Sequence, residues 1–298
     1  MRRALTAGTM LGAIAAAAFA LLPLSAHAET RIPFTDVDGG LVQVQATLDG
    51  RLTVPMLVDL GGGIDVLATD VAKRLGLAPT GRFTSWRMSG ERVDTPTARL
   101  SSITVGSFRI DDPVVGTWDG LNGTGIGGLI SATAFRNVPV TFDFANDVLI
   151  LEDPASLAER IRHGARAPLV LQDDRGISLG LFAPFDFGDG QQGLCEIDTG
   201  SQGYFLDPRF ATPLGVDLAD PSLKHVHGSS TDSIVAPIPQ LVLHGAPATA
   251  KEKPPVMFAN LIYDCNVGNE FWKNDVVTFD IPGRALYVNA GRDTPSQR

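Results

Sequence analysis

Two short stretches decide the fold. Leu57–Gly62 reads Leu-Val-Asp-Leu-Gly-Gly, and Glu196–Ser201 reads Glu-Ile-Asp-Thr-Gly-Ser. Each places an aspartate after an apolar segment and before a glycine, and the step from Asp59 to Asp198 is 139 positions. A single Asp-Xaa-Gly is usually an ordinary turn, so the meaning of the pair depends on whether the surrounding sequence is duplicated as well.

The duplication extends along most of the chain. Three further pairs of similar segments follow in the same order, with spacings of 139, 139 and 137: Ala72–Leu77 with Ala211–Val216, Ile103–Gly106 with Val242–Gly245, and Phe135–Asp143 with Trp272–Asp280. Four ordered matches indicate a repeated unit of about 120 residues. We therefore expect a first lobe over residues 29–152, a linker over 153–167 with a short helix over 155–162, and a second lobe over 168–298.

The pattern within each unit is that of short strands and tight turns. Leu41–Leu48 alternates apolar and polar residues and is followed by Asp49-Gly50, which predicts a β-hairpin. The 32 glycines and 20 prolines also favour a turn-rich protein. Only Thr69–Leu75 and Asp207–Leu214 resemble short helices, so the predicted fold class is all-β.

The composition excludes several classes of function. A net charge of −9 argues against a nucleic-acid partner. Two cysteines cannot build a disulfide-dense scaffold or a four-thiolate zinc site. A third interpretation, a structural or ligand-binding β protein, accounts for the composition but not for the duplicated aspartates.

The first 28 residues have the features of a secretory signal peptide. Arg2 and Arg3 precede the apolar stretch Met10–Leu24, and Ser25–Ala28 supplies small residues for cleavage. The stretch is shorter than the roughly 20 residues of a membrane span. We therefore expect a mature chain that begins near Glu29, has no stable membrane anchor, and is periplasmic or secreted.

The duplication predicts that Asp59 and Asp198 face each other across a pseudo-twofold axis. Gly61 and Gly200 allow sharp turns and bring backbone amides near the carboxylates. Two carboxyl groups in contact share a proton, because both cannot ionise easily. Such a pair can hold a water molecule between a general base and a general acid.

These motifs resemble those of the aspartic proteases. Asp198-Thr-Gly-Ser matches the Asp-Thr/Ser-Gly signature, and Val58–Leu77 is similar to the retropepsin-like branch found in bacteria. Leu129–Ser131 and Asn266–Gly268 occupy the place of the strand that passes beside each catalytic turn. The resemblance spans both halves and implies two pepsin-like β-barrel lobes with a cleft between them, in one monomeric chain.

The resemblance also implies the chemistry. An exported aspartic endopeptidase would bind a polypeptide substrate in the cleft and hydrolyse it with Asp59 and Asp198, using neither a cofactor nor a metal. The residues implied to support the catalytic turns are Gly61, Thr199, Gly200 and Ser201. The first turn departs from the family, since Leu60 and Gly62 lack hydroxyls and Ser131 replaces a glycine. The alternative is therefore a weak or inactive relative that binds peptides.

Two further features are implied by the resemblance. The segment Thr84–Val93 corresponds to the substrate-covering flap, with Trp86 as a candidate lid and Ser89-Gly90 at the tip; its counterpart in the second half has a tip near residues 227–229, and the working flap could come from either lobe. Cys195 and Cys265 would lie on neighbouring strands, so they could form a disulfide or remain two buried thiols.

Overall fold

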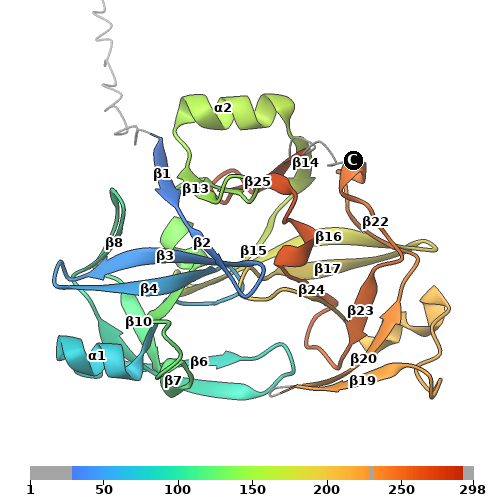
Figure 1. The fold of residues 1–298 in the computed structure, drawn as a ribbon, viewed down its shortest axis with the longest axis horizontal. Helices are drawn as coiled ribbons and strands as arrows, with labels where there is room; N and C mark the ends of the chain where they lie inside the picture. Colours follow the sequence, from blue (N-terminus) through green and yellow to red (C-terminus); the bar gives the residue numbers. More distant parts are fainter. Residues whose placement is uncertain (1–28, 229–230, 291–298) are drawn as a thin grey trace, which may run out of the picture.

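The computed structural model describes residues 29–228 and 231–290, and the predicted signal peptide lies outside them. Within the described residues the strands form three sheets, two of ten strands and one of six. Each large sheet belongs to one lobe, and the six-stranded sheet lies between the lobes and helix α2 (Figure 1). The predicted all-β, two-lobed class is confirmed.

The two large sheets have the same strand order, element for element. The strand order of the first sheet is β6 (Gly81–Trp86), β7 (Arg92–Arg99), β10 (Val114–Trp118), β5 (Val66–Ala68), β11 (Gly128–Ser131), β4 (Leu52–Asp59), β3 (Leu41–Leu48), β8 (Ser102–Val105) and β9 (Phe108–Asp111). Its tenth strand, β2 (Thr35–Val37), also pairs with β3. The strand order of the second sheet is β19 (Lys224–His227), β20 (Asp232–Pro237), β23 (Pro255–Phe258), β18 (Tyr204–Leu206), β24 (Cys265–Val267), β17 (Gln191–Ile197), β16 (Ser178–Gly188), β21 (Gln240–Leu243) and β22 (Lys251–Glu252). Its tenth strand, β15 (Val170–Asp174), also pairs with β16.

The small sheet joins the lobes across the pseudo-twofold axis. Its strands are β1 (Thr30–Pro33), β13 (Val148–Leu151), β12 (Val140–Asp143), β25 (Asp275–Asp280), β26 (Ala285–Ala290) and β14 (Ala165–Pro168). The central pair β12 and β25 are repeat equivalents, and Thr141 and Thr278 lie opposite each other with their hydroxyl oxygens 2.6 Å apart. The side chains of Phe142 and Phe279 pack edge to face beside them, so the cores of the two halves meet there.

The lobes are open sheets and not the closed barrels that we expected. In the described residues β6 pairs only with β7, and β9 pairs only with β8. The physical reason is that the β6–β7 hairpin extends toward the second lobe (Figure 1), which leaves β6 at one end of the sheet, while β9 forms the other end.

Local sequence explains the hairpins. Asp49 and Gly50, between β3 and β4, have φ angles of 51° and 64°. Asp189 and Gly190 repeat this between β16 and β17, with φ angles of 50° and 73°. Positive φ at both central residues matches the right-handed twist of the flanking strands, and glycine adopts it without strain. The predicted turn at Asp49-Gly50 is confirmed.

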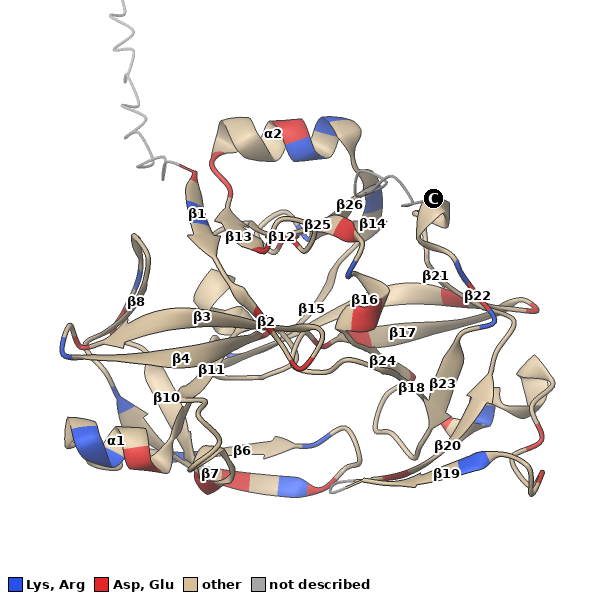
Figure 2. Cartoon of the chain, in the orientation of Figure 1, with Lys and Arg blue, Asp and Glu red and all other residues tan. Residues whose placement is uncertain are grey.

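The helices are short. They are α1 (Thr69–Leu75), α2 (Pro154–His163) and the 3₁₀ turns η1 (Asp119–Leu121), η2 (Ala132–Phe135), η3 (Pro208–Phe210), η4 (Thr212–Leu214), η5 (Pro247–Thr249) and η6 (Asn269–Phe271). Asp153 caps α2 by accepting the backbone amides of Ala155 and Ser156, both at 2.8 Å. Figure 2 shows acidic and basic residues along α2, which buries none of its residues. The predicted linker thus consists of α2 followed by β14.

No helix in the described ranges is long and apolar enough to cross a membrane.

Candidate active site

Each aspartate lies where a central strand of its lobe ends. Asp59 is the last residue of β4, and Asp198 directly follows β17. A parallel partner strand fixes each of these strands from the side: β11 pairs with β4, and β24 pairs with β17. Because the lobes are pseudo-symmetric, the two strand ends meet at the lobe boundary. The structure therefore brings together the two carboxyl groups that the sequence singled out.

The two turns interlock through their glycines. A Cβ atom at Gly61 would lie 2.6 Å from Cγ of Asp198, and a Cβ atom at Gly200 would lie 2.5 Å from Cγ of Asp59. Both separations are well below van der Waals contact. Any side chain at either glycine would displace the carboxyl group of the opposite lobe, so both positions require glycine for the dyad to form.

Backbone amides hold both carboxylates in place. Gly62 N donates to Oδ1 of Asp59, and Gly200 N donates to Oδ1 of Asp198, each at 3.0 Å. Asp198 has an additional donor, Nδ2 of Asn266, at 2.9 Å from Oδ2. The two sites therefore share a backbone arrangement but differ in side-chain support.

The carboxyl groups of Asp59 and Asp198 lie close enough to shift each other's pKa. Burial raises the pKa of both groups, and for Asp59 the neighbouring charge of Asp198 raises the pKa further, to about 8. For Asp198 the hydrogen bonds from Asn266 and Gly200 oppose the effect of burial. Two carboxyls that share a proton are suited to one accepting a proton while the other donates one.

A single hydroxyl links the two turns. Oγ1 of Thr199 accepts the amide of Leu60 at 2.8 Å and donates to the carbonyl oxygen of Val58, also at 2.8 Å. Leu60, which occupies the equivalent position in the first lobe, cannot return these bonds and is buried in the core. The link is therefore made in one direction only.

Ser201 supports its turn through the backbone. Its amide donates to the carbonyl oxygen of Asp198 at 3.2 Å. Within the described ranges its hydroxyl makes no hydrogen bond with that carboxylate, and the side-chain contact comes from Asn266 instead. The sequence did not predict this contact of Asn266, because its position beside Asp198 depends on the register of β24 against β17.

The first lobe compensates for Ser131 with a buried acid. Both the amide and the hydroxyl of Ser131 donate to Oδ1 of Asp65, at 2.7 and 2.9 Å. Burial raises the pKa of Asp65 to about 6, although the hydrogen bonds from Ser131 and Thr133 lower it. At the equivalent position Gly268 has no such room, since a Cβ would lie 2.6 Å from backbone atoms of Ser201 and Gln202. Asp65, which the sequence did not single out, thus accommodates the departure at Ser131.

The β6–β7 hairpin reaches from the first lobe to the second. The amide of Ile262 donates to the carbonyl oxygen of Met88 at 2.9 Å, next to the tip at Ser89 and Gly90. Gly90 has a φ of 83°, as a tight tip requires. Trp86 is 59% exposed and faces the cavity below the hairpin. The tip of the corresponding hairpin of the second lobe falls partly outside the described residues.

A cavity of about 480 Å³ lies under this hairpin, next to the dyad. Gly61 and Gly62 line it from the first catalytic turn, Trp86 from the flap, and Glu196 and Tyr263 from the second lobe. Both lobes and the flap therefore line one cavity. Its position suits an extended chain that lies across the two carboxyl groups.

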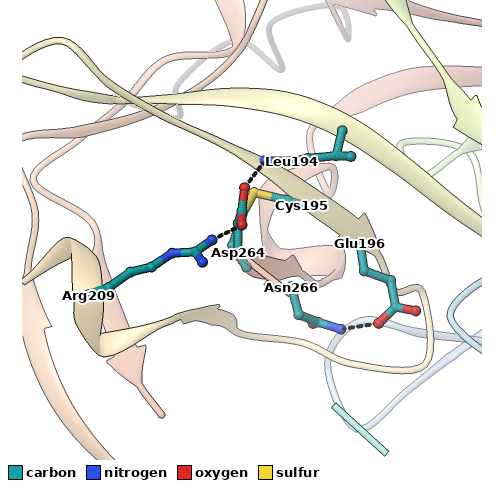
Figure 3. The surroundings of a disulfide bond; sticks show 7 residues. Leu194, Cys195, Glu196, Arg209, Asp264 and Asn266 are labelled. Atoms are coloured by element: carbon teal, nitrogen blue, oxygen red, sulfur yellow. Dashed lines mark hydrogen bonds and ion pairs between the residues drawn. A yellow bond between two sulfur atoms is a disulfide. The ribbon is translucent and has the colours of Figure 1, made fainter. Parts of the chain in front are cut away.

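A disulfide fixes the strand register behind the second aspartate. Cys195 and Cys265 are bonded and directly opposite each other on β17 and β24, with their Cα atoms 4.4 Å apart. The disulfide alternative is confirmed. Figure 3 shows that the next pair along these strands, Glu196 and Asn266, lies beside it, with Nδ2 of Asn266 3.3 Å from Oε2 of Glu196.

Comparisons with known proteins agree with this geometry. A family model described as "Aspartyl protease" matches residues 44–133, which include Asp59 and the flap. Among solved structures, basic 7S globulin from soybean aligns with a TM-score of 0.52 over 88% of this chain and 94% of that chain, at 11% identity, which is a likeness of fold. No curated protein sequence matches the chain. The chain is therefore similar to the aspartyl protease family in its first lobe, and it shares the fold of basic 7S globulin over most of its length.

Proposed function

We propose that the protein is an aspartic endopeptidase that hydrolyses peptide bonds with a water molecule held by Asp59 and Asp198. The observation that carries this proposal is that two interlocked turns bring Asp59 and Asp198 together at the lobe boundary, beside a cavity, where the pKa of both groups is raised. An ordinary turn aspartate has no second buried carboxyl beside it to raise its pKa.

The reaction follows from the geometry of the pair. The carboxylate of the dyad takes a proton from the water, whose oxygen attacks the peptide carbonyl carbon. The protonated carboxyl gives its proton to the carbonyl oxygen, and the pair then returns a proton to the leaving nitrogen as the C–N bond breaks. One water is consumed, and a carboxylic acid and an amine are formed. The substrate chain would lie extended under the flap, where its backbone can pair with strand edges.

The test is cleavage of an unfolded protein by the mature chain between pH 4 and 8. Asp59→Asn and Asp198→Asn should each abolish cleavage, because the mechanism needs two carboxyl groups, one to accept a proton and one to donate it. Asp111→Asn, an exposed change on β9 at the far edge of the first sheet, is the matched control and should keep the parent's activity. Cleavage that persists in either dyad variant would contradict the mechanism.

The second candidate function is peptide binding without turnover. The one-directional link from Thr199, with Leu60 unable to reciprocate, favours it, because a catalytic pair loses much of its rate when it is held less firmly. A binder should show no cleavage at any pH, and it should keep its affinity for peptides when either aspartate of the dyad is replaced. These two outcomes separate the candidates.

Export is part of the proposal. The disulfide supports an oxidising compartment such as the periplasm or the extracellular space. The predicted signal peptide supports the same location. N-terminal sequencing of the protein recovered from its native compartment should find a chain that begins near Glu29.

A further inference from the structure

A third carboxyl group, that of Glu196, lies beside the dyad and has no part in the mechanism above. Residues two apart on a strand point to the same side, so Glu196 and Asp198 both face the cleft, with roughly 6.6 Å between their positions along the strand. The intervening Ile197 and the preceding Cys195 are buried in the core. Glu196 is therefore about one substrate residue away from the reacting centre.

One oxygen of this carboxyl is held and the other is free to bind a ligand. The hydroxyl of Tyr263 and Nδ2 of Asn266 both donate to Oε2. No hydrogen bond to Oε1 is found in the described part of the chain, and Glu196 and Tyr263 both line the cavity. In Figure 3 one oxygen of Glu196 faces Asn266 and the other points away from it. The group is fixed in orientation and available on one side.

Within the described residues, no basic side chain acts on Glu196. Burial, followed by the charge of Asp198, raises the pKa of Glu196 to about 7, and none of the groups that influence it is basic. Arg87 also lines the cavity, but its Nε lies 3.0 Å from the carboxylate of Glu91. A largely buried carboxylate without a counter-charge is unfavourable, so a cationic ligand would be stabilised here.

The first lobe has no equivalent acid. The repeat places Leu57 at the position of Glu196, and Leu57 is buried and apolar. The two sides of the pseudo-twofold axis therefore differ: the second-lobe side of the dyad carries an acid, and the first-lobe side carries a hydrocarbon side chain. A peptide bound across the dyad meets different chemistry on each side of the bond to be cut.

We propose that Glu196 selects polypeptides that place a lysine or arginine side chain in this cavity, next to the scissile bond on the second-lobe side. The inference rests on the proposed function, because it assumes a peptide in the cleft. The ammonium or guanidinium group would pair with Oε1, while Tyr263 and Asn266 keep the carboxylate oriented through Oε2. Charge-assisted bonds of this kind are stronger than neutral ones and discriminate against uncharged analogues.

The cleavage test compares the parent with Glu196→Gln at pH 7 on a denatured protein, with cut sites mapped by mass spectrometry. Gln keeps an oxygen for Tyr263 and Asn266 but removes the charge. We expect lysine and arginine to be enriched roughly tenfold at one position flanking the parent's cut sites, and the enrichment to disappear in Glu196→Gln. Glu252→Gln, an exposed change on β22, is the matched control and should keep the enrichment.

A binding test separates this inference from the proposed function. Two peptide sets, randomised around a central lysine or a central norleucine, are titrated into the Asp59→Asn variant, which is not expected to cleave them. Their ends are acetylated and amidated, so that the N-terminus supplies no cation. We expect roughly tenfold tighter binding of the lysine set, and equal binding of both sets when Glu196→Gln is added.

The outcomes are distinct. A parent that cannot cleave but binds the lysine set more tightly would refute the protease and leave the role of Glu196 intact. A uniform loss of rate in Glu196→Gln, with no change in selectivity, would mean that Glu196 only positions Asp198, and the inference would fail. Equal binding of both peptide sets to Asp59→Asn would also overturn it.

Discussion

The hydroxyl of Thr199 is the feature of the site whose removal has the clearest expected cost. It accepts the amide of Leu60 and donates to the carbonyl of Val58, each at 2.8 Å. All three residues are essentially inaccessible to water. Thr199→Val preserves the shape of the side chain and removes both bonds. Because a buried polar group that loses its partner costs about 1–3 kcal/mol, we expect unfolding free energy to fall by roughly 2–4 kcal/mol.

Thr199→Ser is the matched control. It keeps the hydroxyl and loses one methyl group, which costs about 1 kcal/mol. Urea unfolding of the parent and both variants, followed by tryptophan fluorescence, gives the differences in unfolding free energy. The valine variant should be the less stable of the two by about 1–3 kcal/mol.

The same pair of variants tests the link between the lobes and the dyad. Because the hydroxyl joins the two turns that carry Asp59 and Asp198, Thr199→Val should lower kcat much more than Thr199→Ser does. If the valine variant were as stable and as active as the serine variant, the hydroxyl would not be what holds the turns together, and the reasoning would be refuted.

Three further predictions concern the disulfide, the dyad and the flap. Replacing Cys195 and Cys265 by alanine removes a bridge that spans 70 residues and should cost roughly 4 kcal/mol in urea unfolding; a loss below 1 kcal/mol would contradict this. The pKa of Asp59 is raised from its ordinary 3.8 to about 8, so the folded state binds the extra proton, and unfolding free energy should fall as pH rises from 4 to 8. Urea midpoints across that range should show a shallower fall in Asp59→Asn, and an unchanged slope would refute the assignment. Gly90→Val forces a side chain into a φ of 83° and to within 3.1 Å of Ile262, so it should disturb flap closure and raise KM in peptide cleavage, whereas an unchanged KM would exclude that closure from substrate binding.

The sequence did not predict that the sheets are open and not closed into barrels. The alternation and turn residues predict which segments are strands, and the hairpin at Asp49-Gly50 forms where expected. Whether the end strands of a sheet meet depends on the accumulated twist and on the path of the β6–β7 hairpin. Both arise from packing over the whole lobe and not from any local pattern.

The support of the dyad was predicted in part. The resemblance to the aspartic proteases pointed to Thr199, whose hydroxyl bonds Leu60 and Val58 across the lobe boundary. Asn266, Glu196 and Asp65 were missed as functional side chains. The position of Asn266 beside Asp198 requires the parallel pairing of β17 with β24, which joins segments 70 residues apart and is locked by the disulfide.

The sequence by itself determined the duplication, the strand-rich lobes and the two aspartates, because repeats, period-two alternation and glycine turns are local properties of the chain. Only the tertiary structure decided how the two turns interlock through Gly61 and Gly200, how far the flap reaches, and which acids lie enclosed beside the dyad. Those features depend on long-range register and on exclusion of water, and both exist only after the two lobes have packed against each other.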